Sequence, residues 1–284
     1  MVVGKHMKRI KAYKGNSFSF YQSICSRVKS GRTLLLNLEA RVRDSYKEYD
    51  KSFLSNTLSS LTPLSTLTLK ESKRLEGLYD YNKPELNALM GDLTTNEWGQ
   101  ADKKCPYCRL DFTSTFDHFL PKSKFKEFAV HPKNLIPSCH RCNQYKQDKF
   151  KDLLNLYLDD IPQNKQFLFV RFSIDGENLI VDYFVDNKVG LPAELFKKIQ
   201  ENFETLKLNQ RYKDASKDIF DEVKQQVRIL KNFPNLKADI GVIRNQLLSS
   251  YKESSINAIN LWSNVFKVSS VQNEEVFKYI FDHL

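Results

Sequence analysis

Four cysteines near the middle of the chain have the spacing of a metal-binding site. They form two C-x-x-C pairs, Cys105/Cys108 and Cys139/Cys142, with 30 residues between the pairs. A C-x-x-C pair presents two sulfurs on one tight turn, and two such turns complete the tetrahedral four-thiolate shell that suits Zn²⁺. Because four thiolates leave no coordination position open, we predict that the four cysteines hold a structural zinc ion.

Redox chemistry is the alternative use of a C-x-x-C pair, but a redox dithiol needs one such pair and this chain has two. The remaining cysteine, Cys25, fits a small buried residue. Residues 1–15 are basic and lack the apolar core of a secretory signal. Metal-binding thiols also fit a reducing compartment, so we expect a cytoplasmic protein.

The segment between and just after the cysteine pairs contains residues that could hydrolyse a phosphodiester. Such a reaction needs a base to activate water and a cation to stabilise the departing charge. His118 suits the base because imidazole titrates near neutral pH. Asp117 and Asn143 supply hard oxygen ligands of the kind that Mg²⁺ prefers.

These residues resemble the HNH, or ββα-metal, endonucleases, in the branch whose fold is held by four cysteines. Three motifs carry the resemblance: D-H-x-x-P at 117–121, N-L-I-P-S-C at 134–139 and C-x-x-C-N-x-x-K at 139–146. Their order, their spacing and their interleaving with the cysteines all agree with the family. The resemblance covers about 50 of the 284 residues.

The resemblance implies a role for each matching residue. His118 would activate water, Asn134 would orient His118, and Asp117 with Asn143 would hold one catalytic divalent ion, Mg²⁺ or Mn²⁺. Many members of the family have histidine where this chain has Asn143. An asparagine still supplies an oxygen ligand, but it leaves the preferred metal open.

Several neighbouring residues also carry charge or a ring nitrogen. His140 and His131 could contact a phosphate, although a knuckle position and a loop position explain them as well, and we expect Glu127 and Asp111 to be structural. A site that cuts nucleic acid must approach a polyanion, so we predict that a group of basic residues contacts the backbone phosphates. This group is Lys122, Lys124, Lys126, Arg141, Lys146 and Lys149.

Positive charge is concentrated in the first half of the chain. Residues 1–100 hold 16 Lys/Arg and 10 Asp/Glu, residues 101–150 hold 10 and 5, and residues 151–284 hold 18 and 19. A basic surface favours a polyanionic partner because each neutralised phosphate releases counterions. An ordinary solvated basic surface is the alternative. We expect DNA as the partner, with RNA left open.

Apolar periodicity predicts two helices across 18–54, further helices at 71–80 and 84–90, and a loop at 56–70. We also predict that residues 148–157 continue or follow a helix. FLFVRFSI and LIVDYFV, joined at Asp175–Asn178, read as a β-hairpin. From Pro192 onward the pattern is helical in three or four segments, with one stretch at about 238–266 and a break at Pro234–Asn235.

The predicted fold is therefore α+β: a mostly helical protein with a central ββα-metal unit stapled by the four-cysteine zinc site and one additional hairpin. We divide the chain into a basic helical region at 1–100, a nuclease core at 101–150, and a hairpin plus helical region at 151–284 that could dock a partner. No apolar run approaches the roughly 18 residues of a membrane helix, so we expect no membrane span.

Two functions of different classes compete. The first is a metal-dependent endonuclease, and the second is a zinc-knuckle module that binds nucleic acid or protein without cutting. The joint presence of Asp117, His118, Asn134 and Asn143 favours the nuclease. The phrase Leu206–Arg211 and the arrangement of helices around a cysteine-rich core are similar to the nuclease subunits that accompany ABC-type ATPases in bacterial anti-phage systems such as Septu. This similarity implies an ATPase partner. A stand-alone restriction-type or mobile-element nuclease is the other interpretation.

Overall fold

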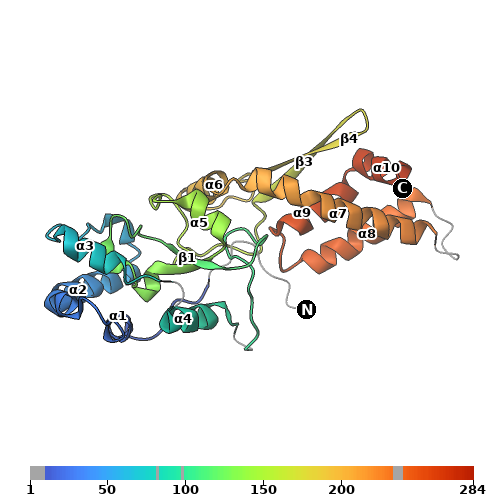
Figure 1. Cartoon of the computed structure of the whole chain (residues 1–284). Helices are drawn as coiled ribbons and strands as arrows, with labels where there is room; N and C mark the ends of the chain where they lie inside the picture. The colour runs from blue at the N-terminus through green and yellow to red at the C-terminus, as the bar shows by residue number, and fades with distance from the viewer. Residues whose placement is uncertain (1–9, 81–82, 97–98, 233–238) are drawn as a thin grey trace. The chain divides into compact units, whose positions relative to one another are not determined.

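The computed structural model describes residues 10–80, 83–96, 99–232 and 239–284 (Figure 1). These residues form two compact units. The N-terminal unit comprises the described residues up to Tyr107 together with Asp111–Asp160, and the C-terminal unit comprises Ile161–Leu284 together with Cys108–Leu110. Helices make up 53% of the structure and the strands form small two-stranded sheets, which confirms the α+β prediction.

Four helices precede the cysteine region in the N-terminal unit. They are α1 (Ser17–Ser26), α2 (Arg32–Leu54), α3 (Leu69–Glu76) and α4 (Pro84–Thr94), and a short 3₁₀ turn, η1 (Leu58–Ser60), lies between α2 and α3. The apolar stripe of α2 is buried along its length, as its three- and four-residue spacing predicts. Helix α3 begins and ends earlier than the predicted 71–80, because Thr68 and Glu71 form a capping box that fixes its start.

The cysteine region folds as a ββα motif. Strand β1 (Thr115–His118) pairs antiparallel with β2 (Leu135–Ser138), and α5 (His140–Lys146) follows directly. The loop between the strands contains two 3₁₀ turns, η2 (Lys126–Phe128) and η3 (Pro132–Asn134). All four residues of β2 are buried, so this strand lies at the centre of the motif.

Residues 148–157 were predicted to continue or to follow a helix, and the structure shows that they follow α5 without continuing it. These residues form turns and irregular backbone after α5 ends, with Gln147 and Asp152 at positive φ. Asn155 supplies the physical reason for part of this stretch, because its side-chain oxygen accepts a hydrogen bond from the backbone N–H of Tyr157 at 3.0 Å. Such a local side-chain bond competes with helical hydrogen bonding.

The described residues of the C-terminal unit form a hairpin and five helices. Strands β3 (Leu168–Asp175) and β4 (Asn178–Val185) pair in register around a turn with Gly176 at φ +58°, which confirms the predicted hairpin. The helices are α6 (Ala193–Thr205), α7 (Leu208–Lys231), α8 (Ile240–Ser255), α9 (Trp262–Gln272) and α10 (Glu274–Asp282). One apolar core is shared by α7, α8, α9 and α10.

The stretch predicted as one helical segment at about 238–266 is two helices, α8 and α9, separated by a turn at 256–261. The predicted break at Pro234–Asn235 lies outside the described residues. Within the part of the chain that the structure describes, no helix combines the length and the apolar character that a membrane span requires.

Candidate metal and nuclease site

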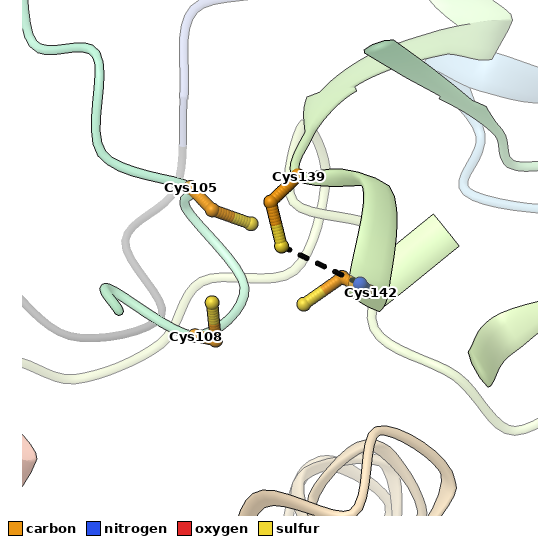
Figure 2. Close-up of side chains that lie close together, drawn as sticks. All are labelled: Cys105, Cys108, Cys139 and Cys142. Carbon is orange, nitrogen blue, oxygen red and sulfur yellow. Dashed lines mark hydrogen bonds between the residues drawn. The ribbon is translucent and has the colours of Figure 1, made fainter. Parts of the chain in front are cut away.

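The sulfur atoms of Cys105, Cys108, Cys139 and Cys142 all lie within 4.8 Å of one another, and all four residues are buried (Figure 2). Thiolates that each lie about 2.3 Å from a tetrahedral zinc ion are about 3.8 Å apart. A small contraction of the cluster would therefore complete a zinc shell. The donor set and its geometry fit the predicted structural zinc.

Each cysteine pair lies on a tight backbone turn. Cys139 is the N-cap of α5, and its sulfur accepts a hydrogen bond from the backbone N–H of Cys142 at 3.4 Å (Figure 2). In the other pair, the N–H of Cys105 donates to the carbonyl of Asp111 at 2.8 Å, and Arg109 takes a positive φ of 57° inside the turn. A backbone N–H thus closes each turn, by donating to a cysteine sulfur in one pair and to a backbone carbonyl in the other.

His118 ends strand β1 and is only 8% exposed. Its Nε2 lies 2.9 Å from the carbonyl oxygen of Ala129, and a carbonyl can only accept, so the ring proton is on Nε2. Nδ1 therefore carries the lone pair that can take a proton. Burial, together with the nearby Lys122 and Lys146, lowers the pKa of His118 to about 3, and the bond to Ala129 opposes this shift. The imidazole is neutral at pH 7.

Asn134 lies in the loop between the strands, and all of its hydrogen-bonding capacity is used. Its Nδ2 donates to the carbonyls of Leu120 (3.0 Å) and Phe128 (3.2 Å), and its Oδ1 accepts from the N–H of Leu120 (2.8 Å) and the hydroxyl of Tyr49 (3.2 Å). The predicted role was to orient His118. In the structure its bonds hold the loop whose Ala129 carbonyl binds that imidazole, so any such orientation is indirect.

Asp117 is buried beside His118 and has a donor on each carboxylate oxygen. Oδ1 is 3.0 Å from the ammonium of Lys146, and Oδ2 accepts from the hydroxyl of Tyr107 at 2.9 Å. The same ammonium donates to the backbone carbonyl of His118 at 2.9 Å. A carboxylate offers about four lone-pair positions, so two donors leave room for a metal ion.

Asn143 lies on α5, one turn before Lys146, and its Nδ2 donates to the carbonyl of Phe116 at 3.3 Å. This bond places its amide group beside the residue that precedes Asp117. Among the described residues none donates to its Oδ1, which is a free oxygen ligand. The oxygens of Asp117 and Asn143 thus fit a hard divalent ion such as Mg²⁺.

The six predicted phosphate-contacting residues differ in their surroundings. Lys124, Arg141 and Lys149 are exposed, and the partly exposed Lys122 lies over the ring of Tyr79, which in turn packs edge-on against His118. Lys126 forms an ion pair with Glu76 at 2.8 Å. Lys146 is 1% exposed. In this conformation the ammonium of Lys146 is engaged inside the site and does not face solvent.

The neighbouring titratable residues lie in different surroundings. His131 is fully buried among the rings of Tyr46, Tyr49 and Phe128, and His140 is exposed on the first turn of α5. Glu127 is buried, and its Oε1 accepts from the N–H of Leu64 at 2.9 Å. The backbone carbonyl of Asp111 closes the first cysteine turn.

Several residues that shape the site were missed in the sequence. Tyr49, Tyr79 and Tyr107 contact Asn134, His118 and Asp117 respectively. Within the C-terminal unit, two side chains bind Cys108. The guanidinium of Arg211 donates to the sulfur of Cys108 at 3.3 Å, and the hydroxyl of Tyr212 donates to the backbone carbonyl of Cys108 at 3.3 Å. Tyr107 lies inside the first cysteine pair, whereas Tyr49, Tyr79, Arg211 and Tyr212 lie outside residues 105–149 and carry no local pattern that links them to a metal site.

Comparison with known families tests the predicted resemblance. Residues 105–149 match the HNH endonuclease family. This match spans both cysteine pairs and the residues between them, which confirms the resemblance found in the sequence. It supports a nuclease.

Two relatives match larger parts of the chain. Protein ea31 of Escherichia phage lambda is 25% identical over 262 residues, which cover 82% of this chain and 86% of the phage protein. The Septu protein PtuB of Bacillus thuringiensis is 32% identical over 106 residues, 35% of this chain and 38% of PtuB. The similarity to a Septu protein is therefore confirmed, over little more than a third of each chain. No solved structure matches the chain significantly.

Proposed function

We propose that the protein is a metal-dependent endonuclease that hydrolyses phosphodiester bonds of DNA. The observation that carries the proposal is the state of His118: a neutral imidazole whose proton is fixed on Nε2 and whose Nδ1 can accept another. Asp117 and Asn143 have oxygens suited to a divalent ion; Asp117 precedes His118 on β1, and Asn143 lies on α5. The match to the HNH endonucleases supports the same conclusion.

In the proposed reaction, Nδ1 of His118 takes a proton from a water molecule as the water oxygen attacks phosphorus. The bond from phosphorus to the leaving oxygen breaks, and solvent returns a proton to that oxygen. Asp117 and Asn143 would hold the divalent ion, which supplies charge stabilisation for the pentavalent phosphate and the leaving oxygen. The carbonyl of Ala129 keeps the imidazole in the tautomer that this step needs.

A free-enzyme pKa of about 3 makes His118 a weak base before substrate binds. Two of the causes are the positive charges of Lys122 and Lys146. A phosphodiester anion beside these lysines would offset them and would raise the pKa of the imidazole. The base therefore becomes stronger when the substrate is in place, which suits its role.

The proposal is tested by incubating supercoiled plasmid with the protein and Mg²⁺ or Mn²⁺. Loss of a general base commonly slows a reaction by 10²–10⁴-fold, so we expect His118→Ala to be slowed by about that factor. His140→Ala is the matched control, because His140 is exposed and in the same motif, and it should cut like the wild type. Equal cutting by wild type and His118→Ala would disprove the catalytic role.

The same assay separates a nuclease from a non-catalytic zinc module. A binding module would shift the mobility of the plasmid in a gel, or bind a protein partner, and would cut nothing at any metal concentration. Single-stranded RNA offered in parallel identifies the nucleic acid that is cut, since the motif alone does not distinguish DNA from RNA.

We further propose that this nuclease acts in anti-phage defence together with an ATPase. The similarity to the Septu protein PtuB supports the proposal. Affinity purification of the tagged protein from its host should recover an ATPase, and survival of phage challenge should depend on His118. Recovery of the protein alone, with survival unchanged in His118→Ala, would favour a stand-alone restriction-type or mobile-element enzyme.

A further inference from the structure

An open groove of about 650 Å³ lies in the C-terminal unit, between strand β3 and helices α8 and α9. This volume is within the roughly 300–1,000 Å³ of ordinary ligand sites. Its lining includes three phenylalanines and two cations, Arg171 and Lys252, and contains no carboxylate. The proposed nuclease residues do not line this groove. Residues 151–284 as a whole hold 18 Lys/Arg and 19 Asp/Glu, so the two cations without a carboxylate are a local feature of the groove.

Two of the phenylalanines form a stacked pair on one face of the hairpin. Phe169 and Phe184 are cross-strand partners, with ring centroids 5.7 Å apart and planes at 26°. Both rings are only partly buried. The other face of the hairpin packs on the helical core, where Phe172 meets Phe266 edge-on. The stacked pair therefore faces away from the core and leaves aromatic surface accessible at the groove.

Cations accompany this aromatic pair. The guanidinium carbon of Arg171 is 4.9 Å from the ring centre of Phe184, and the ammonium of Lys188 is 4.9 Å from that of Phe169. Arg171 is directly opposite Asp182 on β4, but it forms no ion pair with that carboxylate within 4.0 Å. Oδ1 of Asp182 is instead engaged by Asn209 at 3.0 Å and Lys213 at 3.2 Å, and Arg171 adds a longer-range attraction that helps to lower the Asp182 pKa.

Arg171 and Lys252 are thus available to an anion. Neither has a carboxylate within 4.0 Å among the described residues. Arg171 is exposed on β3 and Lys252 is exposed on α8, so the two cations stand on different walls of the groove.

We propose that this groove binds a single-stranded segment of nucleic acid. Bases would stack on the Phe169–Phe184 pair, and the backbone phosphates would lie against Arg171 and Lys252. Aromatic faces interleaved with cations are the combination by which proteins hold unpaired bases without reading their sequence. The inference rests on the proposed function for the class of its ligand and adds a second contact, outside the ββα motif, for an unpaired strand.

Photocrosslinking locates such a contact directly. The full-length protein is mixed with an iodouracil-substituted oligothymidylate, without added divalent ion and without chelator, so that cysteine-bound zinc is kept. Irradiation should link the oligonucleotide to a peptide that contains Phe169 or Phe184. In anisotropy titrations Phe184→Leu, which keeps the apolar volume and removes the ring, should weaken binding by at least about fivefold.

Charge reversal provides the matched pair of variants. Lys252→Glu should weaken binding by a similar factor, whereas Lys217→Glu should bind like the wild type, because Lys217 is an exposed helical lysine outside the groove. If Phe184→Leu loses the far-ultraviolet signal of the hairpin, the comparison of Lys252 with Lys217 decides the question. Crosslinks confined to other peptides, together with wild-type affinity in Lys252→Glu, would overturn the proposal.

The proposal for the groove and the proposed nuclease activity can be disproved separately. Crosslinks at the hairpin in a protein that cuts no plasmid would leave the groove standing and remove the proposed function. If the protein cuts plasmid and both groove variants bind single-stranded nucleic acid with wild-type affinity, the proposed function stands and the groove proposal is disproved. The crosslink can also be challenged with unlabelled competitors. If a purified protein partner suppresses it and unlabelled single-stranded nucleic acid does not, the groove is a protein-docking surface, which would contradict the proposal.

Discussion

His118 and His131 are buried alike, but their surroundings give them different roles. The imidazole of His118 has a carbonyl to bind and a position at the end of a strand, next to a carboxylate. Among the described residues, neither ring nitrogen of His131 has a hydrogen-bond partner, and the ring is enclosed by aromatic rings. A carboxylate oxygen of Asp50 lies 3.7 Å from Nε2, beyond hydrogen-bond distance. Burial holds the pKa of His131 well below its usual range, and Lys133 adds to the shift. Sequence alone left both histidines as candidates.

This difference predicts how acid affects stability. The folded protein keeps His131 neutral, whereas the unfolded chain binds a proton at this residue below pH about 6.5. The contribution of the neutral His131 ring to the free energy of unfolding is therefore complete above that pH and is lost as the pH falls. His131→Phe should remove this dependence, since a phenyl ring fits an aromatic cage. We expect the free energy of unfolding of the wild type to fall more steeply, by up to about 1.4 kcal/mol per pH unit, than that of the variant.

Urea titrations of both proteins at pH 7.5 and pH 5.5 measure this difference. Taking the difference between two proteins that share the cysteine cluster and His118 cancels the contributions of those groups. Parallel acid dependence in the two proteins would mean that His131 is protonated or solvated in the folded state.

At the scale of elements, the cysteine turns were predictable from spacing and the loop between the strands was not. The ββα unit was implied by the resemblance to the HNH endonucleases, which rests on the order and spacing of the motifs. Asn134 was recognised, yet its partner Tyr49 lies on α2, 85 residues earlier. Only the packing of α2 against the loop shows that the site depends on the N-terminal helices. Residues 148–157 follow α5 without continuing it, and the local side-chain bond of Asn155 that contributes to this is not visible in the periodicity of the sequence.

The contact from α2 can be tested with a matched pair of tyrosines on that helix. Tyr49→Phe removes a hydroxyl whose proton is shared by Asn134 Oδ1 and the carbonyl of Lys133, each 3.2 Å away. We expect the change to cost about 1–2 kcal/mol of unfolding free energy and to slow plasmid cutting. Tyr46→Phe removes a buried hydroxyl with no hydrogen-bond partner and should change neither quantity appreciably. Chemical denaturation and the plasmid assay give both readouts. Equal effects in the two variants would show that the bond to Asn134 does not support the site.

The cysteine cluster predicts a second matched pair. Cys139→Ser should lose the bound zinc and destabilise the protein by on the order of 5 kcal/mol, because metal binding contributes directly to folding. Cys25→Ser changes the cysteine that lies outside the cluster and should keep both zinc and stability. Elemental analysis of the purified proteins and their melting temperatures report the outcome. Full zinc content in Cys139→Ser would exclude the four-thiolate site.

At the scale of the whole molecule, the fold class was predictable from sequence patterns, and the uneven distribution of charge is read directly from the sequence. The α+β class follows from helical periodicity on both sides of the cysteine motif and from the β-branched and aromatic hairpin. The division at 100 and 150 stays a prediction. Two compact units describe the structure, and the N-terminal helices share one of them with the ββα motif. Sequence patterns cannot show such sharing because they report periodicity within a segment and not the contacts between segments.

The charge distribution predicts which lysines carry the affinity for nucleic acid. Lys124 is exposed in the ββα motif, so Lys124→Gln should reduce the slope of log affinity against log salt concentration by about 1. Lys217→Gln, an equal change on α7, should leave the slope unchanged. Anisotropy titrations of duplex DNA over a range of salt concentrations measure the slopes. Equal slopes for Lys124→Gln and the wild type would place this lysine outside the nucleic-acid contact.

The most direct test of the nuclease site is the location of its metals. Crystals soaked in Mn²⁺ and measured by anomalous scattering should show zinc among Cys105, Cys108, Cys139 and Cys142, and a separate manganese ion bound by the oxygens of Asp117 and Asn143 next to His118. A map in which manganese binds elsewhere, or in which Asp117 keeps only Lys146 and Tyr107 at saturating Mn²⁺, would contradict the account.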